Sequence, residues 1–450
     1  MKFGDITQGI ITRFDAKGRG EFDVALPDGR TKPMTVPFTT IGDEVEAEHI
    51  KKEKGRYIGK LSRIITPGPD RIPLPDPAFE NFSGAMWLHI AYEAQLKFKR
   101  DMINAAFAEA NHDARVESVM SSSKTTFYRN RMDYVFGSDG EIGLKAYGAW
   151  NRYIDVKKDI LLSEDVPEIL DVFRELLRRF PSVVIWDARR HEGDLRYVVI
   201  REGKNTGERL IALVIQNLEH ITPDMRKFLL LQLDPFANNI VLSENPGITD
   251  LSYGETIVPL KGNATFEEEI NGTTYTIHLN SFFQTNSDMA AKLQDTVYEF
   301  CGDLKNKTLL DLYCGLGFFA INFAQRESSL KARGFEIDAR SIVLANQNAG
   351  RNNVQDRCEF KAGKSEDLSW KDIPSDVTII DPPRAGLHPR VIEALIAKPA
   401  PTLVYVSCNF HRMVEELKEL KKVYTIEKIT ALDLFPHTPH VEVIVKLTLR

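Results

Sequence analysis

The stretch "KTLLDLYCGLGFFAINFA", residues Lys307 to Ala324, decides the fold of this chain. An apolar run is followed by two closely spaced glycines and then by apolar residues at helical spacing, which predicts a buried strand, a tight turn and a helix. Gly315-x-Gly317-x-x-Ala320 fits the dinucleotide fingerprint, and Glu336 closes the next strand where that fingerprint places an acidic residue. Such an acid can accept hydrogen bonds from ribose hydroxyls. A strand–helix turn without a ligand, a nicotinamide site and an S-adenosylmethionine site all fit this stretch alone.

The chain that follows narrows the choice of ligand. From about residue 306, strand and helix patterns alternate, which predicts a parallel α/β sheet. The segment "SDVTIIDPPRAGL" is the expected fourth strand and ends in Asp381 followed by two prolines. Proline cannot extend a central strand, so this loop should lie at the carboxyl edge, where open sheets bind ligands. An acid followed by prolines at this strand end is typical of nucleic-acid base methyltransferases and favours S-adenosylmethionine, although a chance Asp-Pro-Pro turn has the same letters.

One cysteine stands apart from the other three. The expected fifth strand, "TLVYVSCNF", brings Cys408 to the same carboxyl edge as Asp381, whereas free cysteines are more often small buried hydrophobes. No two cysteines form a C-x-x-C pair and no His/Cys group has zinc spacing, so we predict no metal site and a reduced, cytoplasmic compartment.

Near the C-terminus, "LFPHTPHVEVIVKL" carries His437, His440 and Glu442 into a last strand; a glutamate there is most often a solvated edge residue.

The remaining chain predicts two further domains. Residues 1–66 carry short strands broken by turns, which predicts a small β-barrel, and a Pro-rich linker follows. Residues 67–280 should form a mixed α+β domain, with a helix near 91–110 that packs on the catalytic domain of residues 281–450. Tyr57 is surrounded in the sequence by six basic residues, a pattern that suits either a solvated face or RNA binding: Lys51, Lys52, Lys54, Arg56, Lys60 and Arg63.

Charge and hydropathy exclude some classes of protein. The formal net charge of −6 argues against a simple basic coat for nucleic acid, although a local patch remains compatible with it. No apolar run reaches the roughly 18 residues that a membrane helix needs, and the N-terminus does not resemble a secretory signal. We therefore expect no membrane partner.

Together, these motifs resemble the uracil-5 RNA methyltransferase family, which makes 5-methyluridine in transfer and ribosomal RNA with S-adenosylmethionine. The matching segments occur in family order and cover nearly the whole chain: "YRNRMDYVFG", "FFQTNSDM", "DLYCGLGFF", "GFEID", "DPPRAG", "YVSCNF" and "FPHTPHVE". The resemblance implies a class I, Rossmann-like catalytic domain, an N-terminal TRAM barrel of the oligonucleotide-binding type, and the mixed central domain between them.

The resemblance also implies roles for particular residues. Cys408 would be the nucleophile that adds to uracil C6, and Glu442 the general base that removes the C5 proton. The cofactor contacts that it implies are Gln284, Tyr313, Gly315, Gly317, Phe318, Glu336 and Asp381. Phe318 stands where better-known members often have asparagine, so a contact there should use the backbone or ring packing only.

The chain departs from the family at the cysteines that bind an iron–sulfur cluster in many members. Asp76, Phe82 and Ala85 stand at three of those positions, and the fourth corresponds to Asp159. Because clusters are held by cysteine thiolates, we predict that this chain binds none and that Phe79, Phe82 and Trp87 form an apolar group in its place.

The TRAM-like barrel favours 23S ribosomal RNA as the substrate, by analogy with the family. A transfer-RNA T-loop methyltransferase is the alternative within the same enzyme class. A non-catalytic RNA-binding protein and a nicotinamide oxidoreductase are the alternatives from other classes. We expect a monomer. The modified uridine, and whether one or two sites are methylated, do not follow from the sequence.

Overall fold

The computed structural model describes residues 2–26, 29–149 and 151–450. The N-terminal segment forms a strongly curved six-stranded sheet in the order β1-β5-β6-β4-β3-β2, and Lys54 and Gly55 make the turn between its two longest strands. Its core contains Phe22, Met34, Val45 and Tyr57. The strands are β1 (Ile6–Ile10), β2 (Arg13–Phe14), β3 (Gly20–Ala25), β4 (Thr31–Val36), β5 (Glu44–Glu53) and β6 (Arg56–Thr66). The predicted barrel is therefore present.

The middle of the chain builds a seven-stranded sheet in the order β10-β9-β8-β11-β12-β13-β14. Alternate residues of its central strands face two different cores: Val198 and Ile200 meet two helices, whereas Val199 meets a separate hairpin. The strands are β8 (Arg131–Phe136), β9 (Ile142–Lys145), β10 (Tyr153–Asp155), β11 (Leu195–Glu202), β12 (Arg209–Ile215), β13 (Asn239–Glu244) and β14 (Thr256–Lys261). The helices are α2 (Val166–Arg179) and α3 (Pro223–Leu233), and the hairpin is β15 (Thr265–Ile270) and β16 (Thr273–His278).

The C-terminal part forms an eight-stranded sheet in the order β19-β18-β17-β20-β21-β23-β22-β7. Five neighbouring strands are parallel, and β23 enters antiparallel between β21 and β22. The strands are β17 (Thr308–Leu312), β18 (Lys331–Glu336), β19 (Cys358–Ala362), β20 (Val377–Ile380), β21 (Thr402–Ser407), β22 (Tyr424–Leu432) and β23 (Glu442–Leu449). The helices are α4 (Ser287–Cys301), α5 (Phe318–Arg326), α6 (Ala339–Arg351), α7 (Pro389–Ala397) and α8 (Phe410–Leu420). This is the predicted class I methyltransferase sheet.

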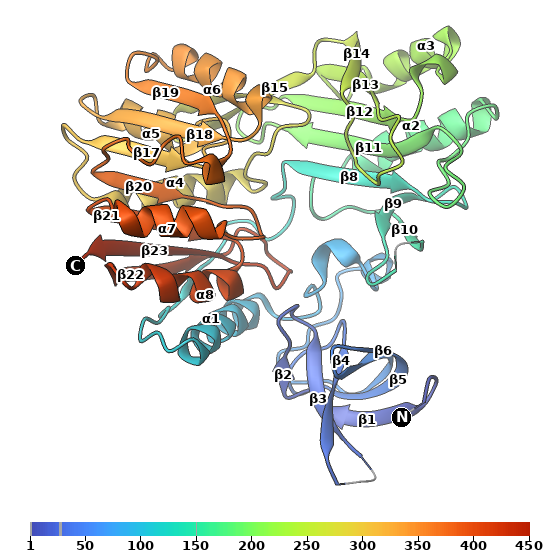
Figure 1. Ribbon diagram of the computed structural model, residues 1–450. Coiled ribbons are helices and arrows are strands. Elements are labelled where there is room, and N and C mark those ends of the chain that lie inside the picture. The colour runs from blue at the N-terminus through green and yellow to red at the C-terminus, as the bar shows by residue number, and fades with distance from the viewer. Residues whose placement is uncertain (1, 27–28, 150) are drawn as a thin grey trace.

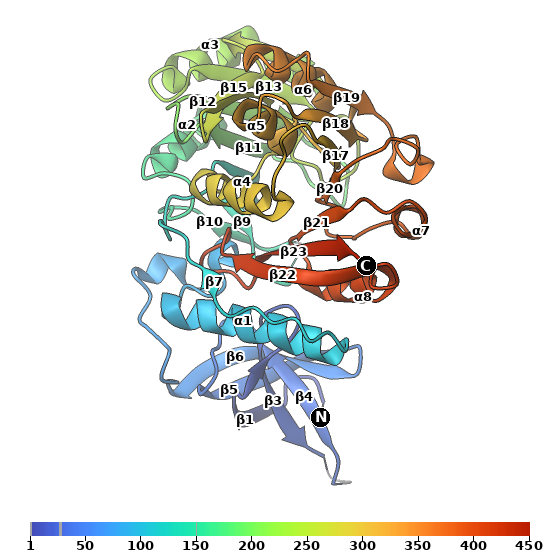
Figure 2. The ribbon, with the colours of Figure 1, turned by 90° about the vertical axis from the view of Figure 1, so that its left-hand side faces the viewer.

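One helix joins the three parts. Helix α1 (Tyr92–Glu109) lies between the barrel and the β22–β23 side of the large sheet in both views (Figures 1 and 2). Its residues Ile103 and Phe107 share a core with Leu417 of α8. The following strand β7 (Val119–Met120) pairs with β22. The helix expected near residues 91–110 therefore packs on the catalytic sheet; the domain boundaries at residues 66 and 280 stay predictions.

No helix in the described parts of the chain is both long and apolar enough to cross a bilayer.

Candidate active site

The large sheet brings the predicted catalytic residues to one edge. Ile380 of β20 pairs with both Leu312 and Tyr405, so the parallel strands β17, β20 and β21 end side by side. Asp381 and Cys408 directly follow two of these strand ends. Strand β23 runs the other way and pairs Val443 with Ser407, which sets Glu442 beside Cys408. Residues more than thirty positions apart therefore meet because of strand register.

The thiol of Cys408 lies beside two buried carboxyl groups, Glu442 and Asp381, and the guanidinium of Arg384. Burial raises its pKa to about 11, and the Glu442 and Asp381 carboxylates raise it in the same direction. The guanidinium of Arg384 lowers the pKa through its charge and a hydrogen bond to the thiol. In the free protein Cys408 is therefore mostly a protonated thiol at neutral pH.

The two carboxyl groups beside the thiol also favour their protonated forms. Burial raises the pKa of Asp381 to about 7. Glu442 is only 3% exposed, and burial together with the Asp381 charge raises its pKa well above the usual range. Arg384 again acts in the opposite direction. A carboxyl with a raised pKa is a stronger base once it has lost its proton.

Arg384 and His440 form a pair that the sequence analysis missed. Nη2 of Arg384 lies 3.0 Å from the His440 ring nitrogens, and the Asn409 side chain donates to the Arg384 carbonyl at 2.9 Å. Desolvation and the Arg384 charge lower the pKa of His440 to about 4, although its ring reaches the surface. His440 is therefore neutral and can accept from Arg384. The sequence did offer one signal for Arg384, because it is a basic residue that directly follows the predicted Asp-Pro-Pro loop.

The predicted cofactor loop has space beside it. Gly315 has φ of +53°, and a side chain there would meet nothing within 4 Å, so the region is open. Gly317 has φ of +81°, and a side chain there would overlap Ile321 and Phe360, so this glycine is needed for packing. The Glu336 carboxylate accepts from Gly315 N–H at 3.2 Å, which holds it over the loop.

The other predicted cofactor residues differ in what they offer. Tyr313 is half-buried at the end of β17 with φ of +66°. Gln284 is buried, and its backbone carbonyl accepts from the Asn130 side chain at 2.8 Å. The ring of Phe318 points into the core against Phe283, with ring centroids 5.6 Å apart. Phe318 therefore offers its backbone N–H and not its ring.

An exposed aromatic lies close to Gln284 in the sequence. Phe282 is 70% exposed, two residues before Gln284 in the "FFQTNSDM" segment, and the sequence analysis gave it no role. An exposed ring beside an active site can stack on a nucleic-acid base.

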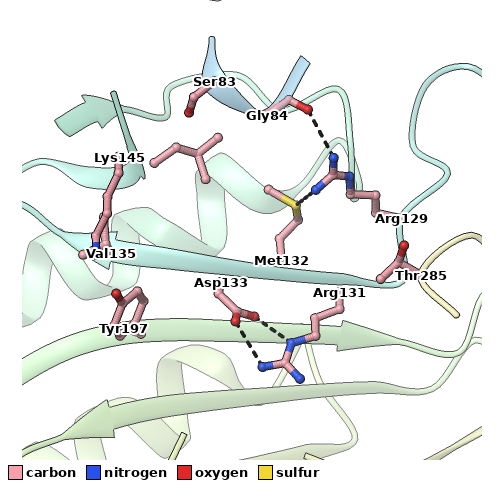
Figure 3. Close-up of a pocket in the computed structure, with 11 residues that line it drawn as sticks. Ser83, Gly84, Arg129, Arg131, Met132, Asp133, Val135, Lys145, Tyr197 and Thr285 are labelled. Atoms are coloured by element: carbon pink, nitrogen blue, oxygen red, sulfur yellow. Dashed lines mark hydrogen bonds and ion pairs between the residues drawn. The ribbon is translucent and has the colours of Figure 1, made fainter. Parts of the chain in front are cut away.

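A cavity of about 450 Å³ lies beside strands β8 and β9 of the central sheet and contains both basic and acidic side chains. Its lining includes Arg129, Arg131, Lys145 and Tyr197, as Figure 3 shows. Arg129 donates to the Gly84 carbonyl at 3.2 Å, and its neighbour Tyr128 donates to the Pro436 carbonyl of the catalytic loop at 3.1 Å. The Arg129 charge also helps to lower the pKa of His440. Arg129 therefore both lines the cavity and acts on His440 through its charge.

A larger cleft, of about 1080 Å³, separates the barrel from the central sheet. Lys17, Lys51, Lys60 and Arg63 contribute to its walls, where Glu53 pairs with both Lys17 and Lys51. Exposed lysines and arginines suit an RNA backbone, which is the partner that the sequence predicted.

Tyr57 cannot take the part in RNA binding that its position among basic residues suggested. It is only 3% exposed and packs in the barrel core, with Lys32 and Lys52 Nζ 5.7 and 5.5 Å from its ring centroid. Tyr57 lies in the buried first part of β6, whereas Lys60 and Arg63 further along the same strand are exposed. It has no free face for an RNA base.

Comparison with known proteins identifies the family. A family profile described as tRNA (Uracil-5-)-methyltransferase matches residues 266–450. The tRNA (uracil(54)-C(5))-methyltransferase of Pyrococcus furiosus is 34% identical over 440 residues, which cover 98% of this chain and 99% of that protein. This chain belongs to the RNA uracil-5-methyltransferase family. It is thus an RNA (uracil-5-)-methyltransferase, as its motifs predicted.

Two other relatives also match almost the full length of this chain. The 23S rRNA (uracil(747)-C(5))-methyltransferase of Pyrococcus horikoshii is 31% identical, covering 98% of this chain and 99% of that protein. The crystal structure of Pyrococcus abyssi tRNA (uracil-54, C5)-methyltransferase in complex with S-adenosyl-L-homocysteine superposes with a TM-score of 0.79 at 31% identity. It covers 98% of this chain and 100% of that one. The barrel, central sheet and catalytic sheet are therefore shared features.

The methyltransferase uses the four cluster-cysteine positions for packing and hydrogen bonds. Phe82 is 2% exposed and meets Phe79 edge-on, with centroids 5.4 Å apart. The Asp159 carboxylate accepts from Tyr134 OH at 2.8 Å and from the Leu161 and Leu162 N–H groups at 2.7 and 2.6 Å. The predicted Phe79–Phe82 group is present. That no cluster is bound stays a prediction.

Trp87 does not belong to that aromatic group. Its ring packs against Phe14 of the barrel and Phe98 of α1, with ring centroids 4.9 and 6.4 Å away. The expectation that Trp87 fills the cluster position was wrong. The chain turns at residues 83–86 and carries Trp87 away from Phe79 and Phe82 into a separate apolar group with Phe98.

Proposed function

We propose that this enzyme uses S-adenosylmethionine to methylate C5 of the T-loop uridine of tRNA that corresponds to position 54. The support is that the P. furiosus tRNA enzyme is 34% identical and the P. horikoshii 23S rRNA enzyme 31% identical. The sequence analysis favoured 23S rRNA because of the barrel. The tRNA relative matches 98% of this chain, barrel included, so the barrel does not distinguish the two substrates.

The observation that carries the chemistry is the meeting of Cys408 and Glu442 at the edge that holds Asp381. In the proposed reaction the Cys408 thiolate adds to uracil C6, which makes C5 an enolate carbon that can attack a methyl group. Arg384 offsets the two carboxylates and favours the thiolate. Its pairing with neutral His440 leaves that positive charge uncancelled.

After methyl transfer, C5 carries both a methyl group and a proton. Glu442 is the group that we assign to remove this proton, so that the Cys408–C6 bond breaks and the base becomes aromatic again. Its raised pKa suits this step, because a carboxylate that holds a proton strongly is a competent base. Burial excludes water, which would otherwise compete for the same proton.

The residues of the Gly loop fit S-adenosylmethionine, which supplies the methyl group when bound. The open space at Gly315 admits a ligand close to the backbone, and the Glu336 carboxylate lies where it can accept from ribose hydroxyls. Ile337, which follows Glu336, is 64% exposed and offers an apolar surface for the adenine ring. Asp381 and Gln284 would flank the methionine end.

The RNA would approach from the basic side of the site. Arg129, Arg131 and Lys145 line the cavity beside the central sheet and suit phosphates (Figure 3), although Arg131 also pairs with Asp133 and Lys145 with Asp250. Exposed Phe282 suits a stacked base. The target uridine must leave its stack to reach Cys408.

The test is methyl transfer from labelled S-adenosylmethionine to a tRNA transcript that contains U54, with a U54→C transcript and a U747-containing fragment of 23S rRNA as comparisons. We expect label in the first RNA only, and none with Cys408→Ala, which should still bind the cofactor. Label in the 23S fragment and not in tRNA would replace the proposed substrate. An active Cys408→Ala enzyme would refute the mechanism.

A further inference from the structure

The barrel touches the loop that carries His440 towards the catalytic edge. Gly18, in the turn between β2 and β3, has φ of +72°, and a methyl group there would lie 2.2 Å from Cβ of Pro439. The Gly18 backbone is thus in direct contact with the residue before His440. A contact this close transmits any movement of one partner to the other, because packed interiors are stiff.

The barrel turn is itself rigid. Asp15 accepts from the N–H groups of Lys17 and Arg19 at 2.9 Å, and Arg19 Nη2 forms a buried ion pair with Asp15 at 2.6 Å. The Asp15 carbonyl also accepts from Gly18 N–H at 2.8 Å. Pro439 therefore packs against a rigid turn.

Trp87 links the same turn to the same loop a second time. Its indole N–H donates to the Gly18 carbonyl at 2.7 Å, and its backbone N–H donates to the His437 carbonyl at 2.8 Å. Gln95 of α1 completes the arrangement. Its side chain donates to the Trp87 carbonyl at 3.1 Å, accepts from His437 N–H at 2.9 Å, and lies 3.0 Å from His437 Nδ1.

We propose that the β2–β3 turn of the barrel is a positioning element of the active site, which seats Pro439 and so holds His440 against Arg384 beside the nucleophile. The chain of contacts runs from Gly18 to Pro439, along the backbone to His440, and across 3.0 Å to Arg384. The Arg384 charge in turn lowers the pKa of the Cys408 thiol. The barrel thus supports the chemical step in addition to any part in RNA binding.

The test is Gly18→Ala in the full-length enzyme, with Gly4→Ala as its matched control. Both glycines lie in the barrel with positive φ, +72° and +84°, but a side chain at Gly4 would meet nothing within 4 Å. The two variants therefore share the backbone strain, and only Gly18→Ala pushes on Pro439.

The readout is the single-turnover rate of methyl transfer, measured with total RNA from cells that lack 5-methyluridine so that it does not depend on which RNA is the substrate. We expect Gly18→Ala to slow this rate by about 10- to 100-fold, because small displacements of reacting groups have effects of that size. The RNA concentration for half-saturation should stay unchanged. The rate of covalent trapping by 5-fluorouridine RNA should fall in parallel. Gly4→Ala should match wild type.

A double-variant cycle tests the contact itself. Pro439→Gly removes the two atoms nearest to the new methyl group, Cβ and Cγ of Pro439, and leaves the Trp87 ring at 3.1 Å, so Gly18→Ala should cost much less when added to Pro439→Gly. Hydrogen exchange of the 433–441 peptide, which needs no RNA, should rise in Gly18→Ala and not in Gly4→Ala. If Gly18→Ala does not fold, Trp87→Phe, which removes the hydrogen bond to Gly18, should show the same slow turnover.

An unchanged methylation rate in Gly18→Ala would overturn the proposal, as would an equal loss in both Pro439 backgrounds or a loss explained wholly by weaker RNA binding. The proposed substrate is judged separately, by which RNA fraction carries the label in wild type.

Discussion

The reactivity of Cys408 should depend on pH in a way that the charges around it dictate. Its pKa of about 11 means that about one thiol in a thousand is ionised at pH 8, since each pH unit below the pKa lowers the thiolate fraction tenfold. Alkylation of the free enzyme by iodoacetamide should therefore accelerate about tenfold per pH unit between pH 7 and 10. The thiolate fraction increases as the pH rises towards the raised pKa, so the alkylation rate should show no plateau near pH 8.5.

Variants of the neighbouring charges should move this profile in opposite directions. Glu442→Gln removes a carboxylate that raises the Cys408 pKa, so alkylation at pH 9 should become faster even though turnover stops. Arg384→Met removes the group that lowers the pKa, so alkylation should slow. Glu427→Gln, at an exposed position of β22, is the matched control and should leave the profile unchanged.

The measurement is the alkylated fraction of the Cys408 peptide by mass spectrometry as a function of time. The other three cysteines are buried and serve as internal controls that should stay unlabelled: Cys301, Cys314 and Cys358. A wild-type profile that levels off below pH 9, or a Glu442→Gln variant that reacts more slowly than wild type, would refute this account of the site.

Other predictions concern the base, the fold and the barrel. Glu442→Gln should form the covalent adduct with RNA and transfer the methyl group but release product slowly, so labelled RNA should stay with the protein on a denaturing gel; normal turnover would assign the base elsewhere. Phe82→Ala should lower the free energy of unfolding by about 3–5 kcal/mol in urea titrations because it leaves a cavity in the core, whereas an unchanged transition would show that the ring is not structural. Lys99→Met should cost a similar amount, about 3–5 kcal/mol, because Asp433 would keep a buried charge without its partner; Lys99→Met with Asp433→Leu should recover part of it. Removing residues 1–66 should weaken RNA binding and flatten its dependence on salt concentration, and an equal salt slope with and without the barrel would contradict its role in binding phosphates.

Most of the catalytic edge could be predicted from the sequence because its parts are local. Cys408 and Asp381 each follow a strand whose apolar run is readable, Glu336 ends another such strand, and the carboxyl ends of parallel strands meet at one edge by the geometry of the sheet. Glu442 was harder, since only the antiparallel pairing of Val443 with Ser407 shows that its strand starts beside Cys408.

The sequence by itself determined the order of strands and helices, the Gly loop and the residue types that the chemistry needs, because each depends on neighbours along the chain. Only the tertiary structure decided that Tyr57 points into the barrel, that Trp87 leaves the Phe79–Phe82 group, and that Gly18 supports Pro439. These outcomes depend on which faces of distant elements meet. Gly18 and Pro439 are more than four hundred residues apart, and no local propensity or spacing encodes the packing that brings them into contact.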